Sequence, residues 1–192
     1  TVVVPVHATG AIEHIARRHD GHVIRTKVNP TALMEACQEN ENVVLGGSSD
    51  MGFIFPQMHP GFDAMFCIAK IIEMLTIQEH TLGQIWAELP RISHRTQTLR
   101  CPWTSKGALM RYLVETHPAD QLELVDGVKV LDPDVDGWIL VLPDAGEPLV
   151  HIYANSEDRE WVDEKLNEYR QKVLAFIEQE QGIHQVPQET AS

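Results

Sequence analysis

Two loops of this sequence hold the residues best suited to bind a ligand. The first, residues 46–52, follows an apolar run and reads Gly-Gly-Ser-Ser-Asp-Met-Gly. Small residues let a backbone approach a ligand closely, and Ser48, Ser49 and Asp50 can exchange hydrogen bonds with hydroxyl groups. The second, residues 143–148, reads Pro-Asp-Ala-Gly-Glu-Pro. Taken alone, each loop is also compatible with an ordinary connection between strands.

Other motifs of known chemistry are incomplete. Residues 132–137 alternate aspartates before a glycine, as a calcium loop does, but the twelfth position of that loop, which needs glutamate, is Pro143. His14, His19 and His22 lack a further clustered ligand, so we assign them to a solvent-facing helix end and predict no metal site. The sequence contains no nucleophile elbow, Walker loop, dinucleotide fingerprint or zinc-protease motif, which argues against those enzyme classes.

Composition indicates a globular protein without nucleic-acid or membrane partners. Hydrophobic residues make up 43% of the 192 residues and charged residues 22%, an ordinary balance for a folded domain. The formal charge of -13 has the wrong sign for phosphate backbones. The longest apolar stretch, residues 64–75, is too short to span a bilayer. Three irregularly spaced cysteines favour free thiols and a cytoplasmic location.

Hydrophobic periodicity predicts two domains, the first over residues 1–90. Short β-branched runs alternate there with helical patterns, which is typical of an α/β layer with parallel strands. A capping box of Thr81 and Gln84 starts a helix that stops at Pro90. We expect the helix at residues 62–76 to be buried, because it is apolar on most of its circumference. The remaining predicted elements are strands at 2–6, 22–26, 42–45 and 53–55 and helices at 11–18 and 31–39.

The second predicted domain covers residues 95–182 and follows a linker at residues 90–94. Its order is β-α-β-β-β-α, and Asp126-Gly127 between two alternating strands predicts a tight hairpin. Gly182 is predicted to end the last helix, and residues 183–192 form a polar tail that we expect to be disordered. The predicted strands are 96–101, 122–125, 128–131, 138–142 and 150–153, and the helices are 106–115 and 156–182.

In this order and spacing, the segments resemble the phosphohexomutases, the phosphomannomutase and phosphoglucomutase family, over almost the whole chain. Residues 25–28 are similar to the family's Thr-Xaa-Val-Gly turn, and residues 45–55 fall on its sugar-specificity loop, Gly-Glu-Xaa-Ser-Gly-His with an apolar strand. Residues 126–130 match its Asp-Gly-Val-Lys hairpin. Residues 138–148 fall on its phosphate loop, Arg-Pro-Ser-Gly-Thr-Glu-Pro.

The resemblance implies a mixed α/β chain that is part of a longer protein. Residues 1–90 would be the three-layer α/β/α third domain without its opening strand and helix, and residues 95–182 the fourth, α+β domain with TATA-binding-protein-like topology. The family is an isomerase group of carbohydrate metabolism, classed as intramolecular phosphotransferases. In it a phosphoserine gives its phosphoryl group to a hexose monophosphate, and the resulting bisphosphate reorients and returns the other phosphate. Its phosphoserine and its magnesium loop lie in upstream domains, so this chain is expected to hold no catalytic residue and no cofactor of its own.

The resemblance also assigns site residues by position in the first domain. Ser48 stands for the family's sugar-binding Glu, Asp50 for its Ser and Gly52 for its His. Ser49 lies between them, and Lys27 would supply a cation if its turn faces the cleft. The implied ligand is a hexose phosphate.

In the phosphate loop, the same comparison places Leu142 at the family's Arg, Asp144 at its Ser and Gly146 at its Thr, with Ala145 between them. Charge-assisted hydrogen bonds of an arginine are worth about 1.5 to 3 kcal/mol each. Leu142 is therefore expected to weaken phosphate binding about tenfold to a hundredfold or more. Asp144 adds a negative charge where the phosphate would bind.

Two functions remain open at this point. The chain is either the carboxy-terminal part of a mutase that needs its upstream domains, or a catalytically degenerate module. In the second case it would regulate or scaffold a fused or associated nucleotidyltransferase of the mannose-1-phosphate guanylyltransferase type. The altered phosphate loop favours the second hypothesis. The family fold is compatible with both hypotheses, because a fold alone does not determine a function.

Overall fold

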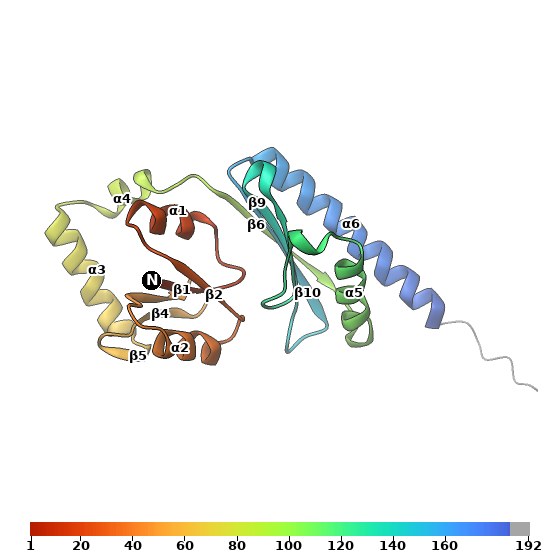
Figure 1. Ribbon diagram of the computed structural model, residues 1–192, viewed down its shortest axis with the longest axis horizontal. Helices are drawn as coiled ribbons and strands as arrows, with labels where there is room; N and C mark the ends of the chain where they lie inside the picture. Colours follow the sequence, from red (N-terminus) through yellow and green to blue (C-terminus); the bar gives the residue numbers. More distant parts are fainter. Residues whose placement is uncertain (185–192) are drawn as a thin grey trace, which may run out of the picture. The chain divides into compact units, whose positions relative to one another are not determined.

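A computed structural model describes residues 1–184 of the chain (Figure 1). The chain forms two compact units, one from Thr1 to Ile92 and one that begins at Ser93. Both combine helices with a five-stranded sheet, so the architecture is mixed α/β. Within the described residues, no helix has the length and apolar character needed to cross a bilayer.

The sheet of the first unit has the strand order β2-β1-β3-β4-β5. Three neighbouring strands are parallel: β2 (Val23–Thr26), β1 (Val2–Pro5) and β3 (Leu45–Ser48). The strands β4 (Gly52–Phe55) and β5 (His59–Phe62) continue the sheet in antiparallel fashion. The carboxyl ends of β2, β1 and β3 therefore meet at one edge, and the loops that follow them lie there.

Two helices cover this sheet, and Figure 1 shows them on opposite sides of the strands: α1 (Ala11–Arg18) and α2 (Pro30–Glu39). The second begins where it does because the Asn29 side chain accepts a hydrogen bond from the Ala32 amide at 2.7 Å and proline occupies the first helical position. α2 packs on β1, β3 and β5. The buried core below it consists of Val3, Leu33, Cys37, Val43 and Ile54.

The predicted strand at residues 42–45 was misplaced, because β3 runs through the glycines that the sequence suggested were a loop. A Cβ atom on Gly46 would lie 2.2 Å from the Cys37 sulfur, and one on Gly47 would lie 2.5 Å from the Gly52 carbonyl oxygen. These glycines permit close packing of β3 against α2 and β4, so their absence of side chains serves the fold. Strand β5 was not predicted, since Pro60 and Gly61 conceal its pattern.

The expectation that the long apolar helix is buried was wrong. That helix, α3 (Ala64–Gln78), is capped by Asp63 and has no buried residue. Met65 is 84% exposed and Ile77 is 75% exposed, and Trp86 of the following helix α4 (Leu82–Glu88) is 78% exposed. Among the described elements, α3 packs mainly against β4, so an all-round apolar helix is covered on one side only.

The second unit has an antiparallel sheet with the order β6-β10-β9-β8-β7. Its strands are β6 (Ser93–Arg100), β7 (Leu122–Glu123), β8 (Val128–Asp132), β9 (Gly137–Pro143) and β10 (Leu149–Ser156). Because β6 already starts at Ser93, the predicted linker at residues 90–94 ends earlier than expected. The calcium-like residues 132–137 form the turn between β8 and β9, with a short 3-10 turn at Pro133–Val135.

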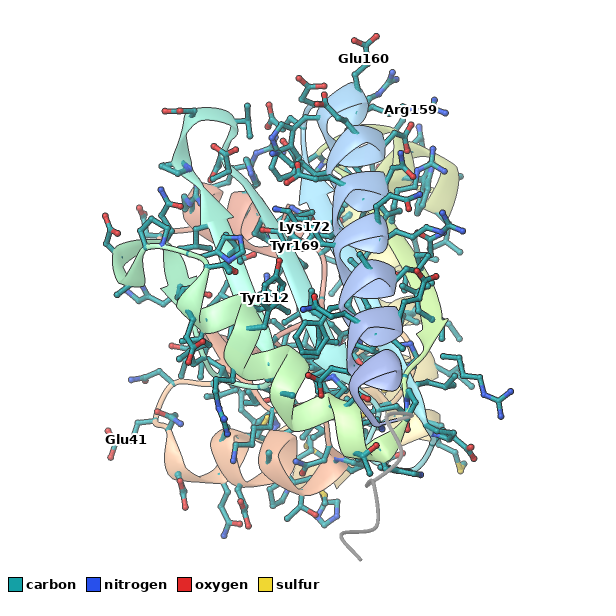
Figure 2. The ribbon with its side chains drawn as sticks, turned by 90° about the vertical axis from the view of Figure 1, so that its right-hand side faces the viewer. Glu41, Tyr112, Arg159, Glu160, Tyr169 and Lys172 are labelled. Carbon is teal, nitrogen blue, oxygen red and sulfur yellow. The ribbon has the colours of Figure 1, made fainter. Side chains whose placement is uncertain are left out.

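Two helices pack on this sheet, α5 (Trp103–Glu115) and α6 (Arg159–His184), with a 3-10 turn at Ala119–Gln121. Figure 2 shows α5 and α6 side by side, with Tyr112 and Tyr169 in the region between them. Helix α6 continues through Gly182, since one glycine costs only about 1 kcal/mol within a helix. The predicted tail at residues 183–192 lies outside the described residues from position 185 onwards.

The hairpin predicted at Asp126-Gly127 forms, because β7 and β8 pair in antiparallel fashion, but its connection is longer than the tight turn expected and covers residues 124–127. Gly127 has φ +68°, and a Cβ atom there would lie 2.4 Å from the Val141 carbonyl oxygen.

Gly127→Ala is therefore expected to lower the free energy of unfolding by about 2 to 3 kcal/mol, measured by urea denaturation. Gly107→Ala is the control, since a Cβ in that helix meets nothing within 4 Å. Equal stability of the two variants would contradict the prediction.

Candidate functional site

Three polar side chains gather at the edge where the parallel strands of the first unit end. Ser48, the last residue of β3, donates a short hydrogen bond to Oδ1 of Asp50. His7 follows β1, and its Nε2 lies 3.5 Å from Oδ2 of Asp50. Since β1 and β3 are parallel neighbours, their carboxyl ends bring His7 and Asp50 together although 43 positions separate them.

The environment of Asp50 keeps its carboxyl group ionised. Burial raises its pKa, but hydrogen bonds from Ser48 and from the backbone, together with His7, outweigh burial and lower the pKa below its ordinary value of 3.8. The Asp50 side chain is 53% exposed, whereas Ser48 is buried. Asp50 is therefore the acceptor of this cluster that an external hydroxyl group can reach.

The other two predicted residues of this site, Ser49 and Lys27, lie at the same edge of the sheet, outside the cluster of Ser48, Asp50 and His7. Ser49 is exposed in the turn after β3, and Lys27 is exposed directly after β2. In the sheet, β1 separates β2 from β3. The structure thus places Ser48 and Asp50 in direct contact and leaves the roles of Ser49 and Lys27 as predictions. His7 was missed by the sequence reasoning, although its position right after a buried strand was a usable signal.

Arg25 of β2 holds the backbone on both sides of His7. Its guanidinium donates to the carbonyl oxygens of Pro5 at 3.1 Å and Ala8 at 2.6 Å. The same group makes a paired contact with both carboxylate oxygens of Glu13, at 2.8 and 2.7 Å. The guanidinium carries five N–H donors in a rigid fork, so it can bind a carboxylate and two carbonyl oxygens at once. The Arg25 side chain is only 11% exposed. Arg25 thereby positions the segment that carries His7.

The second loop, residues 143–148 between β9 and β10, is held by contacts on both its amide and its carbonyl groups. Asp144 Oδ1 accepts hydrogen bonds from the backbone amides of Gly146 at 2.7 Å and Glu147 at 2.8 Å. Oδ2 of the same carboxylate lies 3.0 Å from Nε2 of His151. The Lys106 ammonium group donates to the carbonyl oxygen of Asp144 at 2.6 Å and to that of Glu147.

These contacts explain the acidity of Asp144. The hydrogen bond from His151, followed by those from the Gly146 and Glu147 amides, lowers the pKa of the carboxyl group to about 2. Leu142 is buried within β9 and brings no cation to the loop, while Ala145 and Gly146 form its exposed tip.

Lys106 was also missed by the sequence reasoning, which took it as the start of a helix. The helix begins at Trp103, and the Lys106 ammonium lies 3.6 Å from the centre of the Trp103 ring. Lys106 is buried together with Leu109 and Leu113, at the spacing i, i+3 and i+7. A lysine on the apolar stripe of a helix was the signal that could have revealed it.

A cavity of about 480 Å³ lies in the second unit near the Gly137 end of β9, away from loop 143–148. Several of the polar side chains that line it contact one another. Tyr169 bonds His117 at 2.8 Å, and Glu168 accepts from Lys165 at 2.8 Å and from Lys172 at 2.6 Å. Figure 2 shows Tyr169 and Lys172 on the same helix. We therefore infer that the residues lining this cavity stabilise the fold and do not form a ligand site.

Across residues 1–184, no group of three or more His, Cys, Asp and Glu side chains could hold a metal ion.

Comparison with known proteins identifies relatives of this fold. Residues 1–92 match the family model described as phosphoglucomutase/phosphomannomutase, alpha/beta/alpha domain III. A probable phosphoglucosamine mutase of Methanopyrus kandleri is 34% identical over 182 residues, which cover 93% of this chain and 39% of that protein. A phosphoglucomutase/phosphomannomutase of Thermococcus kodakarensis is 27% identical over 180 residues, covering 93% of this chain and 38% of that protein.

A solved structure agrees with these relatives at the level of the fold. The phosphoglucomutase/phosphomannomutase family protein from Burkholderia thailandensis superimposes with a TM-score of 0.74 at 18% identity, covering 91% of this chain and 37% of that one. The chain thus spans about two fifths of the length of the proteins it matches. These matches confirm the resemblance noted in the sequence. The chain belongs to the phosphohexomutase family, with the family's α/β/α domain III at residues 1–92.

Proposed function

We propose that this chain is the sugar-reading part of a phosphohexomutase and that it acts only together with further domains. In this proposal, residues 1–92 bind the hydroxyl groups of a hexose phosphate. The phosphoserine that would give a phosphoryl group to the sugar and take the other one back is proposed to lie in those further domains. Relatives named for glucosamine, glucose and mannose phosphates define the substrate class to test.

The observation that carries the proposal is the cluster of Asp50, Ser48 and His7 at the edge of domain III. Ligands of open α/β sheets bind beyond the carboxyl ends of the parallel strands, which is where this cluster lies. An ionised, half-exposed carboxylate accepts hydrogen bonds from sugar hydroxyls and so fixes the orientation of the sugar. Lys27, at the end of β2, would attract the phosphate group of the same ligand.

The second unit is proposed to be the family's fourth domain. Its elements follow the order β6-α5-β7-β8-β9-β10-α6, which has one strand more between the two helices than the β-α-β-β-β-α order expected from the sequence. Its sheet is antiparallel throughout, and α5 and α6 pack on it. The position of loop 143–148 between β9 and β10 supports its equivalence to the family's phosphate loop.

The test is a coupled assay on the full-length parent protein with glucose 1-phosphate, mannose 1-phosphate and glucosamine 1-phosphate, supplied with magnesium and a hexose bisphosphate primer. Wild-type parent is expected to turn over at least one of these substrates. Asp50→Ala is expected to lower kcat/KM by about tenfold to a hundredfold, because a hydrogen bond to a charged acceptor is worth about 1.5 to 3 kcal/mol.

The control for the charge change is Glu41→Ala, since Glu41 is an exposed carboxylate of the same unit, labelled in Figure 2. Equal kcat/KM of the Asp50 and Glu41 variants would rule out a sugar-reading role for Asp50. Absence of turnover in a well-folded parent would favour the alternative, a degenerate module that regulates or scaffolds a nucleotidyltransferase. Two features favour this alternative: Leu142, which precedes loop 143–148, brings no cation, and Asp144 of the loop adds a negative charge.

A further inference from the structure

In loop 143–148 two backbone amides and a histidine all contact one carboxylate of the loop itself, that of Asp144. The amides of Gly146 and Glu147 converge on Oδ1 of Asp144 at 2.7 and 2.8 Å, and the imidazole of His151 reaches Oδ2 at 3.0 Å. Successive backbone amides that point to one place make a concavity suited to an anion. In this loop the two amides point to the carboxylate of Asp144.

The arrangement exceeds what an ordinary aspartate turn requires. A turn of that kind needs only the contacts of Oδ1 with following amides. Here His151 binds the second oxygen, and the Thr98 hydroxyl lies 3.0 Å from Nδ1 of His151 and so helps to orient the ring. Lys106 fixes the loop through two carbonyl oxygens. The carboxylate of Asp144 is thus held at both oxygens within a loop that is itself anchored.

We propose that Asp144 is the built-in anion ligand of this loop and that it excludes external phosphate from the site. An external anion would have to displace the Asp144 carboxylate, which is covalently held next to the amides that bind it. After displacement, the carboxylate would still lie nearby and would repel the anion. That phosphate is the excluded anion rests on the proposed function, in which loop 143–148 is equivalent to the family's phosphate loop. Its test measures binding, so it can succeed or fail whatever the parent's turnover.

The experiment is a titration of the full chain with inorganic phosphate, followed by the NMR signals of the Gly146 and Glu147 amides. Wild-type chain is expected to show no saturable shift of these signals at millimolar phosphate. Asp144→Ser removes the carboxylate and is expected to bind phosphate at the two amides at least about tenfold more tightly than the wild type. Asp134→Ser changes the net charge equally at an exposed turn and should behave as the wild type.

Two outcomes would overturn the inference. One is saturable phosphate binding at these amides in the wild type. The other is an Asp144→Ser variant with an intact amide spectrum that binds no better than Asp134→Ser, because the carboxylate would then not be what closes the site.

A second readout follows the carboxyl carbon of Asp144 while the pH is lowered. With its pKa lowered to about 2, Asp144 is expected to stay largely ionised at pH 3, where an ordinary aspartate is mostly protonated. The groups that contact its carboxylate are His151 and the backbone amides of Gly146 and Glu147, while the Lys106 ammonium contacts the Asp144 main-chain carbonyl oxygen. His151→Gln weakens the contact with Oδ2 of Asp144, so the pKa of Asp144 should rise towards the ordinary aspartate value. Titration of wild-type Asp144 near 3.8 would contradict its place in the anion site.

Discussion

Lys106→Met is expected to lower the free energy of unfolding by about 3 kcal/mol, which is more than a hundredfold in the folding equilibrium. Methionine keeps the apolar stem of the side chain but removes the ammonium group. The carbonyl oxygens of Asp144 and Glu147 then lose a charged donor, and the contact with the Trp103 ring is lost as well. Urea denaturation followed by circular dichroism measures the change.

The location of the effect can be checked separately. Amide hydrogen exchange of residues 143–148 is expected to accelerate in Lys106→Met, since the loop loses its anchor. Arg111→Met serves as the control, because Arg111 is an exposed cation on the same helix. If the two variants differed by less than about 1 kcal/mol, the range of an ordinary surface contact, Lys106 would not anchor the loop.

Arg25→Met is the second substitution with a large expected effect, about 3 to 4 kcal/mol of lost stability. It leaves the Glu13 carboxylate without its paired partner and removes the donors from the Pro5 and Ala8 carbonyl oxygens. Removal of one member of a partly buried ion pair costs more than the pair contributes, because the remaining charge is poorly solvated. Thermal and urea unfolding measure the loss, with the exposed Arg18→Met as the control.

A double-mutant cycle with Glu13→Gln separates the ion pair from the carbonyl contacts of Arg25. We expect a coupling energy of about 1 to 3 kcal/mol between the two side chains. The Arg25 variant should also release the segment that carries His7, so the pKa of Asp50 should rise as the contribution of His7 is lost. Additive single effects and an unchanged titration of Asp50 would show that Arg25 does not position this edge.

Local signals in the sequence determined the starts and turns of several elements. Asn29 followed by proline starts α2, and Thr81 with Gln84 forms the capping box of α4. Asp126-Gly127 makes the hairpin between β7 and β8. Each of these depends on dihedral preferences and hydrogen bonds within a few residues, so it can be predicted before the rest of the fold is known.

The tertiary structure decided which residues meet. His7 reaches Asp50 because β1 and β3 are parallel neighbours, and Lys106 reaches Glu147 across 41 positions of the chain. No pattern of local periodicity encodes such distances, since they depend on how distant strands and helices pack.

The same reason explains the elements that the sequence misrepresented. The glycines of β3 suggested a flexible loop, yet the packing of Gly46 against Cys37 makes them part of a strand. The apolar composition of α3 suggested burial, yet among the described residues no second layer covers it. The carboxylate of Asp144 suggested an exposed charge, and only the folded loop shows that its own amides and His151 bind it. Composition indicates what a side chain can do, whereas its neighbours in the fold determine what it does.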